Sequence, residues 1–239
     1  ALSLTWAFGF NKDVVDGVHS LCSGKRDALF FIAAHTGVIY DYANRTQQLL
    51  QQGHCNPITA VAVSHNKKWV VTADAGSDSM MVVWDTLSGT PIKSIFNPHP
   101  HGVLSVDISP DALFLVTLSA QRESNQEPTP NEIEYQTISL WEWTQPDKDE
   151  ALYTSVIEEP DEQKVARFNK SDIRQIITTG DHKTMFWGWE DGGLRGYVPR
   201  VSRHDFKQSK GTYTCCCFLT GTSQAITATS HGEVSLIRS

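Results

Sequence analysis

The sequence has no long apolar run and no excess of basic residues. None of its apolar runs approaches the roughly 20 residues that a membrane-spanning helix requires, so no such helix is expected. The formal net charge is -7 at pH 7. Because phosphate binding requires a basic surface, this charge argues against nucleic acid as the main partner.

The sequence also lacks the common signatures of catalysis and metal binding. It contains no Cys-x-x-Cys pair, nucleophile elbow, phosphate-binding glycine loop or HExxH helix. The acidic stretch 147–150 lacks the glycine and ligand spacing of a calcium loop. Cys215, Cys216 and Cys217 are consecutive, and alternate side chains of a strand face opposite ways, so the three thiols cannot meet at one metal. We therefore expect reduced thiols, no cofactor and no enzyme activity.

What the sequence does contain is a repeat of short strands. Gly53-His54 and Trp84-Asp85 bracket three runs that alternate with period 2. A GH pair and a WD pair around such runs are typical of one blade of a WD40 β-propeller. Propellers more often bind other macromolecules than catalyse reactions, so the repeat favours a scaffold.

The Trp-Asp position recurs along the chain. It is filled by Tyr40-Asp41, Trp84-Asp85, Trp141-Glu142 and Trp187-Gly188, at intervals of 44, 57 and 46 residues. The WD40 period is about 40–45 residues. A polar insertion at residues 121–136 accounts for the long interval. The fold class predicted is therefore all-β: a WD40 β-propeller.

The repeat divides the chain into four blades and most of a fifth. Leu2–Thr5 is expected to form a leading strand, and the whole to be part of a larger ring of about seven blades in a longer protein. The expected blades span residues 18–52, 53–97, 98–159, 160–201 and 202–239.

Several polar residues are expected to form buried networks within blades rather than catalytic sites. In the second blade a histidine, a threonine, a turn aspartate and the tryptophan would be hydrogen-bonded in series. Isoleucine stands at the tryptophan position of the fifth blade, so no network is expected there. The predicted members are His54, Thr72, Asp78 and Trp84 in the second blade, His101 and Trp141 in the third, and Asp181 and Trp187 in the fourth.

The nearby pair His99 and His101 could in principle bind a metal. The flanking prolines restrict the geometry and further ligands are missing, so we interpret this stretch as a blade connection. Two other connections are candidates for partner binding, because charge complementarity orients partners. They carry Glu123, Glu127 and Glu132 in the acidic insertion, and Arg195, Arg200, Arg203, Lys207 and Lys210 after the fourth blade.

The amino-terminal segment carries a more specific resemblance. Residues 1–12, Ala34–Tyr40, Trp69–Asp74 and Val82–Thr86 resemble the cilia- and flagella-associated WD40 protein family of the calmodulin- and spoke-associated complex. The strongest stretch covers residues 1–118, and the 121–136 insertion departs from the pattern. The echinoderm microtubule-associated-protein-like family is the rival, since it also has a motif like Trp6–Phe10 ahead of its blades.

The resemblance implies a scaffold in the ciliary or flagellar axoneme, on the cytoplasmic, reducing side. Its place would be the radial spoke base, where it would help regulate dynein-driven motility beside calmodulin-associated subunits and, as a further possible partner, the doublet microtubule. The alternative is a WD40 protein that binds the microtubule lattice directly, which the net charge disfavours. An enzyme with a propeller fold is the third hypothesis, and a stoichiometric bound metal would favour it.

Overall fold

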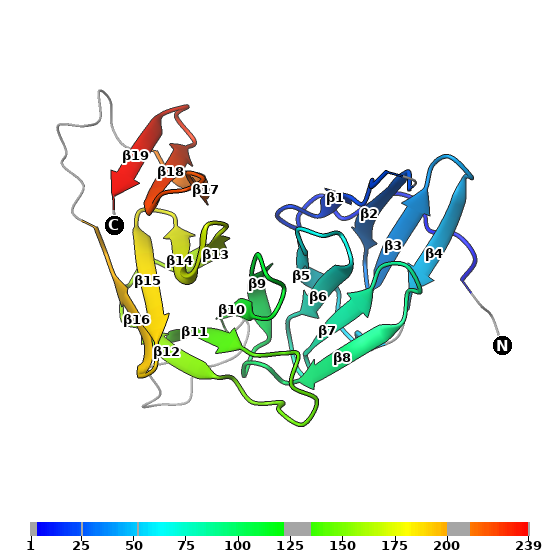
Figure 1. The fold of residues 1–239 in the computed structure, drawn as a ribbon, viewed down its shortest axis with the longest axis horizontal. Coiled ribbons are helices and arrows are strands. Elements are labelled where there is room, and N and C mark those ends of the chain that lie inside the picture. The colour runs from blue at the N-terminus through cyan, green and yellow to red at the C-terminus, as the bar shows by residue number, and fades with distance from the viewer. Residues whose placement is uncertain (1–3, 25, 52, 122–134, 200–210, 239) are drawn as a thin grey trace.

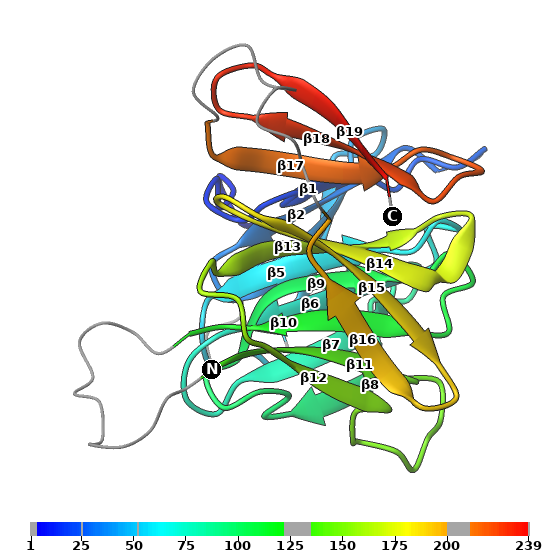
Figure 2. The ribbon, with the colours of Figure 1, turned by 90° about the vertical axis from the view of Figure 1, so that its left-hand side faces the viewer.

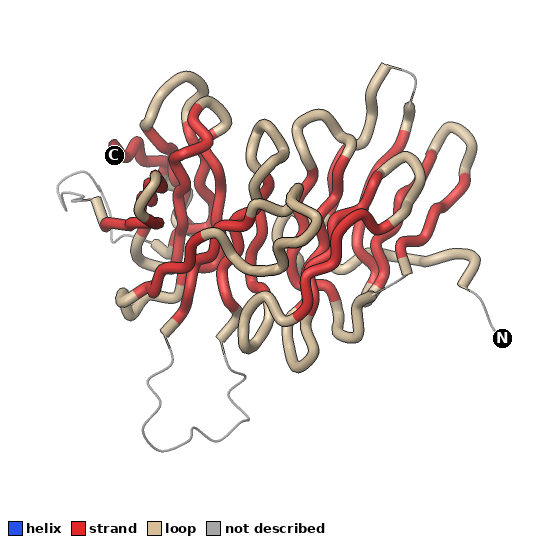
Figure 3. Tube along the Cα trace, turned by 60° about the horizontal axis from the view of Figure 1, so that its bottom comes forward, coloured by secondary structure: helices blue, strands red, loops and turns tan. Residues whose placement is uncertain are grey.

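A computed structural model describes residues 4–24, 26–51, 53–121, 135–199 and 211–238. Strands, turns and loops make up these residues, and none of them is helical (Figure 3). This part of the chain accordingly contains no helix long and apolar enough to cross a membrane. The prediction of an all-β chain is confirmed.

The strands form five antiparallel sheets, each built from consecutive strands. Sheet one contains β1 (Val18–Ser20), β2 (Ala28–Ala33), β3 (Thr36–Asp41) and β4 (Thr46–Leu50). Sheet two contains β5 (Ile58–Val63), β6 (Trp69–Asp74), β7 (Met80–Asp85) and β8 (Pro91–Phe96). Sheet three contains β9 (Val103–Ile108), β10 (Leu115–Ser119), β11 (Gln136–Trp141) and β12 (Tyr153–Ile157). Sheet four contains β13 (Gln163–Asn169), β14 (Asp172–Gly180), β15 (Thr184–Glu190) and β16 (Gly193–Tyr197). Sheet five is β17 (Tyr213–Phe218), β18 (Gln224–Thr229), β19 (Val234–Arg238).

The sheets follow one another around an open arc (Figure 1), and the view turned by 90° shows sheet five at the top with sheet four below it (Figure 2). The first strand of each sheet lies toward the inside of the arc, and the last strand of each four-stranded sheet lies outside. Pro91 begins the outer strand β8, a position where its missing N–H costs no ladder hydrogen bond. Consecutive meanders arranged in this way are consistent with a β-propeller-like fold.

Each pair of neighbouring sheets encloses one apolar cluster. Trp84 belongs to the cluster between sheets one and two, Trp141 to that between two and three, and Trp187 to that between three and four. Ile237 takes the same place between sheets four and five. Each of these side chains therefore packs toward the preceding sheet, and sheet-to-sheet burial of apolar area is the main stabilising term of the arc.

The five sheets lie within the five residue ranges expected from the repeat. The leading strand is different: Leu2 and Ser3 lie outside the described residues, and Leu4 and Thr5 form no strand. Their segment instead runs beside sheet one. There the Gln47 side chain accepts a hydrogen bond from Ala7 N at 2.8 Å and donates one to Ala7 O at 3.1 Å. Trp6 packs edge-on against Tyr40, with ring centroids 6.0 Å apart.

Sheets two and three approach closely at a glycine. Gly102 has φ +84° and forms a β-bridge with Ala75, while Gly76 N donates to His101 O at 2.9 Å. A Cβ on Gly102 would lie 2.4 Å from Ala75 Cα and 2.6 Å from Asp74 O. Both the backbone conformation and the close approach therefore require glycine here.

Candidate docking platform and its buried networks

A buried hydrogen-bonded network joins β6 and β7 of sheet two to the segment that precedes β5. Thr72 Oγ1 lies 2.8 Å from Trp84 Nε1 and 2.7 Å from His54 Nε2. His54 Nδ1 lies 3.1 Å from Asp74 Oδ2, and the side chains of His54 and Asp74 are 1% and 0% exposed. The structure thus brings together His54, Thr72 and Trp84, and it closes the network on Asp74.

The donors and acceptors assign the direction of this network. An indole N–H can only donate, so Trp84 donates to the Thr72 oxygen, and the Thr72 hydroxyl donates to His54 Nε2. His54 Nδ1–H then donates to Asp74 Oδ2. Asp74 Oδ1 accepts from Met80 N at 2.6 Å, which also holds the start of β7. Every member has its partner inside the protein, so the network stabilises packing and presents no group to a substrate.

The expectation that Asp78 belongs to this network is wrong. Asp78 is exposed in the turn between β6 and β7, with φ +54°. Asp74 is the member because it lies two residues after Thr72 on the same strand, and side chains two apart point to the same face. In the sequence, the two-residue alternation counted from Thr72 identifies Asp74 as the network member.

Sheet three has an equivalent network that uses His99 rather than His101. Thr117 Oγ1 lies 2.9 Å from Trp141 Nε1 and 2.7 Å from His99 Nε2, while His99 Nδ1 lies 3.1 Å from Thr137 Oγ1. The histidine and threonine are separated by 18 residues here and also in sheet two. That equal spacing identifies His99, so the prediction of His101 as the network histidine of this sheet is wrong.

Sheet four has a corresponding network in which a different side chain accepts the hydrogen bond from the threonine. Trp187 Nε1 donates to Thr178 Oγ1 at 3.0 Å, and Thr178 donates to Gln163 Oε1 at 2.8 Å. The prediction of Asp181 in this network is wrong, because Asp181 lies on the surface, where it pairs with Lys164 at 2.7 Å. An amide oxygen has replaced the imidazole, and no local motif in the sequence indicates that exchange.

Sheet five has the threonine of this series without a tryptophan. In sheet two, Thr72 pairs with Val82, and Trp84 lies two residues after Val82. In sheet five, Thr227 pairs with Ser235, and Ile237 lies two residues after Ser235. Ile237 therefore occupies the position that Trp84 has in sheet two, and Cys216 pairs with Thr227 on its other side. The Thr227 hydroxyl is buried without a hydrogen-bond partner. The side chain of Ile237 has no N–H that could donate to this hydroxyl as the tryptophans of the other sheets do.

The threonines provide a matched pair of substitutions. Thr72→Val keeps the side-chain shape but leaves the Trp84 indole and the His54 imidazole without their shared partner, so we expect a loss of about 2–4 kcal/mol of unfolding free energy. Thr227→Val removes a hydroxyl that has no partner, so stability should stay equal or rise by about 1 kcal/mol. Urea unfolding of both variants measures the difference, and equal losses would contradict the networks.

His99 predicts how stability depends on pH. Burial lowers its pKa from 6.5 to about 4. The unfolded chain therefore binds a proton at this site before the folded protein does. This contribution, about 3 kcal/mol in full, is present above pH 6.5 and is lost as the pH falls from 6.5 toward 4.

Replacing His99 with a residue that does not titrate tests this. Gln163 performs the corresponding role in sheet four, so His99→Gln is the matched substitution. We expect urea unfolding free energies of His99→Gln to fall less between pH 7 and pH 4.5 than those of the parent. Parallel pH profiles for the two proteins would show that His99 is not the group responsible.

The cysteines follow the alternation of β17. Cys216 is buried between sheets four and five, and burial raises its pKa to about 11. Cys215 and Cys217 are exposed on the opposite face, and all five cysteines are free. Among the described residues no group of three or more His, Cys, Asp or Glu is placed to hold a metal ion.

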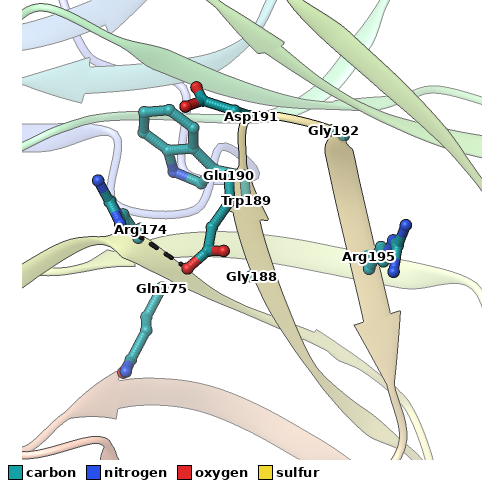
Figure 4. Close-up of a pocket in the computed structure, with 9 residues that line it drawn as sticks. Arg174, Gln175, Gly188, Trp189, Glu190, Asp191, Gly192 and Arg195 are labelled. Atoms are coloured by element: carbon teal, nitrogen blue, oxygen red, sulfur yellow. Dashed lines mark ion pairs between the residues drawn. The ribbon is translucent and has the colours of Figure 1, made fainter.

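One surface candidate lies in a groove on sheet four (Figure 4). Arg195 on β16 lines this groove of about 460 Å³, together with Arg174, Gly188, Trp189 and Glu190. Arg174 and Glu190 form an ion pair at 3.7 Å, and the Trp189 indole donates to Ile173 O at 2.7 Å. A Cβ on Gly188 would meet nothing within 4 Å, so the groove is open to contact from outside.

The remaining surface candidates lie outside the described residues. These are Glu123, Glu127 and Glu132 of the insertion, and Arg200, Arg203, Lys207 and Lys210 of the connection between β16 and β17. Their roles stay predictions, and Arg195 is the one member of the set that the structure places.

Comparison with known proteins gives a consistent result. Residues 2–238 match the profile of the CFAP251 N-terminal domain. The chain is 42% identical over 238 residues to cilia- and flagella-associated protein 251 of Tetrahymena thermophila, covering 98% of this chain and 22% of that protein. It is 36% identical over 247 residues to the Chlamydomonas reinhardtii protein of the same name, covering 98% and 29%, and 28% identical over 237 residues to the mouse one, covering 98% and 17%. The chain thus spans less than a third of the length of each of these relatives.

Proposed function

Because the chain belongs to the CFAP251 family of cilia- and flagella-associated proteins, we propose that it is a non-enzymatic protein–protein scaffold of the ciliary axoneme. Its place there is the base of the radial spoke, where it contributes to the regulation of dynein-driven motility. The family supports a structural role in cilia and flagella. The spoke base, the non-enzymatic character and the partners are the proposal.

The buried networks are the observation that carries the scaffold role. The histidines that would attract attention as catalytic residues, His54 and His99, are used inside sheets two and three. Their hydrogen-bonding atoms are occupied by Thr72, Asp74, Thr117 and Thr137. Chemistry-bearing side chains thus hold the sheets together, which leaves the outer surfaces for contact with other proteins.

We further assign the fold as a WD40 β-propeller whose ring contains about seven blades. The face of sheet five that points away from sheet four supports this, since Val234 and Leu236 are 69% and 51% exposed there. A further sheet packed against this face would cover its apolar side chains. The relatives are several times longer than this chain and have the length to supply it.

Isolation of the axoneme tests the proposed place. The full-length protein, tagged in a motile ciliated cell, should stay with detergent-extracted axonemes, and chemical cross-linking should join it to spoke-base proteins. Release with the soluble fraction would contradict an axonemal scaffold. Saturable pelleting of the purified protein with microtubules alone would favour the alternative, direct lattice binding.

The groove around Arg195 offers a residue-level test of docking. Arg195→Glu reverses a charge at an exposed position and touches no buried network, so folding should be unaffected. We expect weaker retention on the axoneme, because charge reversal at an interface slows association and misorients partners. Lys148→Glu makes the same charge change on another exposed loop and is the control. Equal retention of both variants would remove this groove from the docking surface.

A further inference from the structure

The inside of the arc carries a cluster of charges contributed by the neighbouring sheets three and four and by the segment before sheet one, which neighbours neither of them. Asp107 on β9 and Arg167 on β13 occupy corresponding positions, each one residue after the residue opposite the network threonine of its sheet. Asp16 lies just before β1, at the other end of the arc. Three sheets, numbers one, three and four, thus bring charged groups to one inner edge.

Asp107 connects sheet three to sheet four. Its Oδ2 accepts a hydrogen bond from Phe168 N of β13 at 2.8 Å, and its Oδ1 accepts one from Ile108 N at 2.9 Å. Two residues earlier on β9, Ser105 Oγ accepts from Ala166 N at 3.1 Å. The backbone on either side of Arg167 is therefore fixed to β9 by two side chains.

Arg167 then reaches from sheet four to sheet one. Its Nη1 donates to Ala166 O at 2.9 Å, and its Nη2 forms an ion pair with Asp16 Oδ2. The Arg167 side chain is 21% exposed, and the Asp16 side chain is 59% exposed. Although burial acts to lower the pKa of Arg167, Asp107 and Asp16 outweigh it and hold that pKa above its ordinary value.

We propose that Arg167 is an inner-edge latch, which holds sheet one and sheet four at a fixed separation and so sets the curvature of the arc. Sheets two and three lie between them. Each interface between neighbouring sheets fixes only the angle between those two sheets, so small variations in these angles add up along the arc. A direct contact between sheets one and four constrains the sum of the angles between them. The latch concerns the shape of the arc and goes beyond the proposed scaffold function. A test of the latch therefore does not depend on whether the protein acts in the axoneme.

The latch is expected to act on shape more than on stability. An ion pair with one exposed partner contributes little to folding, so Asp16→Asn should remain folded. Arg167→Lys keeps the charge, but a single ammonium replaces the planar fork that serves Ala166 O and Asp16 together. Asp181→Asn is the control, since it removes the carboxylate of the exposed ion pair with Lys164 within sheet four.

A distance measurement between the two ends of the arc tests the latch. In the full 239-residue chain carrying Cys55→Ser and Cys215→Ala, spin labels are attached to Cys22 before β2 and Cys217 on β17, both exposed. Double electron–electron resonance should give a distribution that broadens and shifts in Asp16→Asn and in Arg167→Lys, and that is unchanged in Asp181→Asn. An unchanged distribution in both latch variants, with circular dichroism showing folded protein, would overturn the proposal. So would an equal shift in the Asp181 control.

Discussion

Replacing Asp74 with alanine is expected to cost about 3–5 kcal/mol of unfolding free energy. The carboxyl group is fully buried and accepts hydrogen bonds from Met80 N at 2.6 Å and from His54 Nδ1 at 3.1 Å. Alanine would leave both donors buried without a partner, and the desolvation of each is then uncompensated. Because the network continues through Thr72 to Trp84, the start of β7 and the segment before β5 should both loosen.

Asp78 is the control that makes this prediction specific. It lies four residues further along, exposed in the β6–β7 turn with φ +54°. Asp78→Asn should change stability by no more than about 0.5 kcal/mol, since asparagine tolerates the left-handed region and no buried group loses a partner. Urea unfolding of the two variants decides which aspartate closes the network, and a larger loss for Asp78→Asn would reverse the assignment.

Gly102→Ala is expected to be the second severe substitution, with a loss of about 3–5 kcal/mol. Its Cβ would lie 2.4 Å from Ala75 Cα and 2.6 Å from Asp74 O. These are backbone atoms held by the Ala75–Gly102 bridge, so they cannot give way without separating sheets two and three. The left-handed φ of +84° adds strain of its own.

Gly232 separates the two causes. Its φ is +80°, close to that of Gly102, but a Cβ there would meet nothing within 4 Å. Gly232→Ala should therefore show the backbone strain alone, about 1 kcal/mol. Thermal or urea unfolding of both variants should give a clearly larger loss for Gly102→Ala. Similar losses would mean that the sheets can move apart and that the close approach carries little of the stability.

Period and spacing in the sequence were enough to predict the strands, the Thr72–Trp84 pair of sheet two, and the tryptophans of the networks in sheets three and four. Alternation places Thr72 and Trp84 on one buried face, and the recurring tryptophan position indicates the corresponding sites in sheets three and four. These features depend on local geometry, which the sequence pattern expresses directly.

The ends of the networks were harder to predict, because they depend on turns and on contacts between segments. The turn after β6 carries Asp78 outward, and His99 sits between two prolines ahead of β9. In sheet four Gln163 supplies the acceptor from within β13, so no histidine marks the position. The path of Leu4–Phe10 along sheet one likewise depends on Tyr40 and Gln47, which lie more than 30 residues away.

Hydrogen exchange at the tryptophan indoles tests the central claim most directly. Trp84, Trp141 and Trp187 each donate Nε1–H to a buried threonine, whereas Trp6 is 37% exposed. In heteronuclear NMR spectra of the isotope-labelled protein in D₂O, the three network indoles should exchange orders of magnitude more slowly than Trp6. Exchange of these indoles as fast as that of Trp6, in a protein whose strands remain protected, would contradict the account that buried networks lock the sheets.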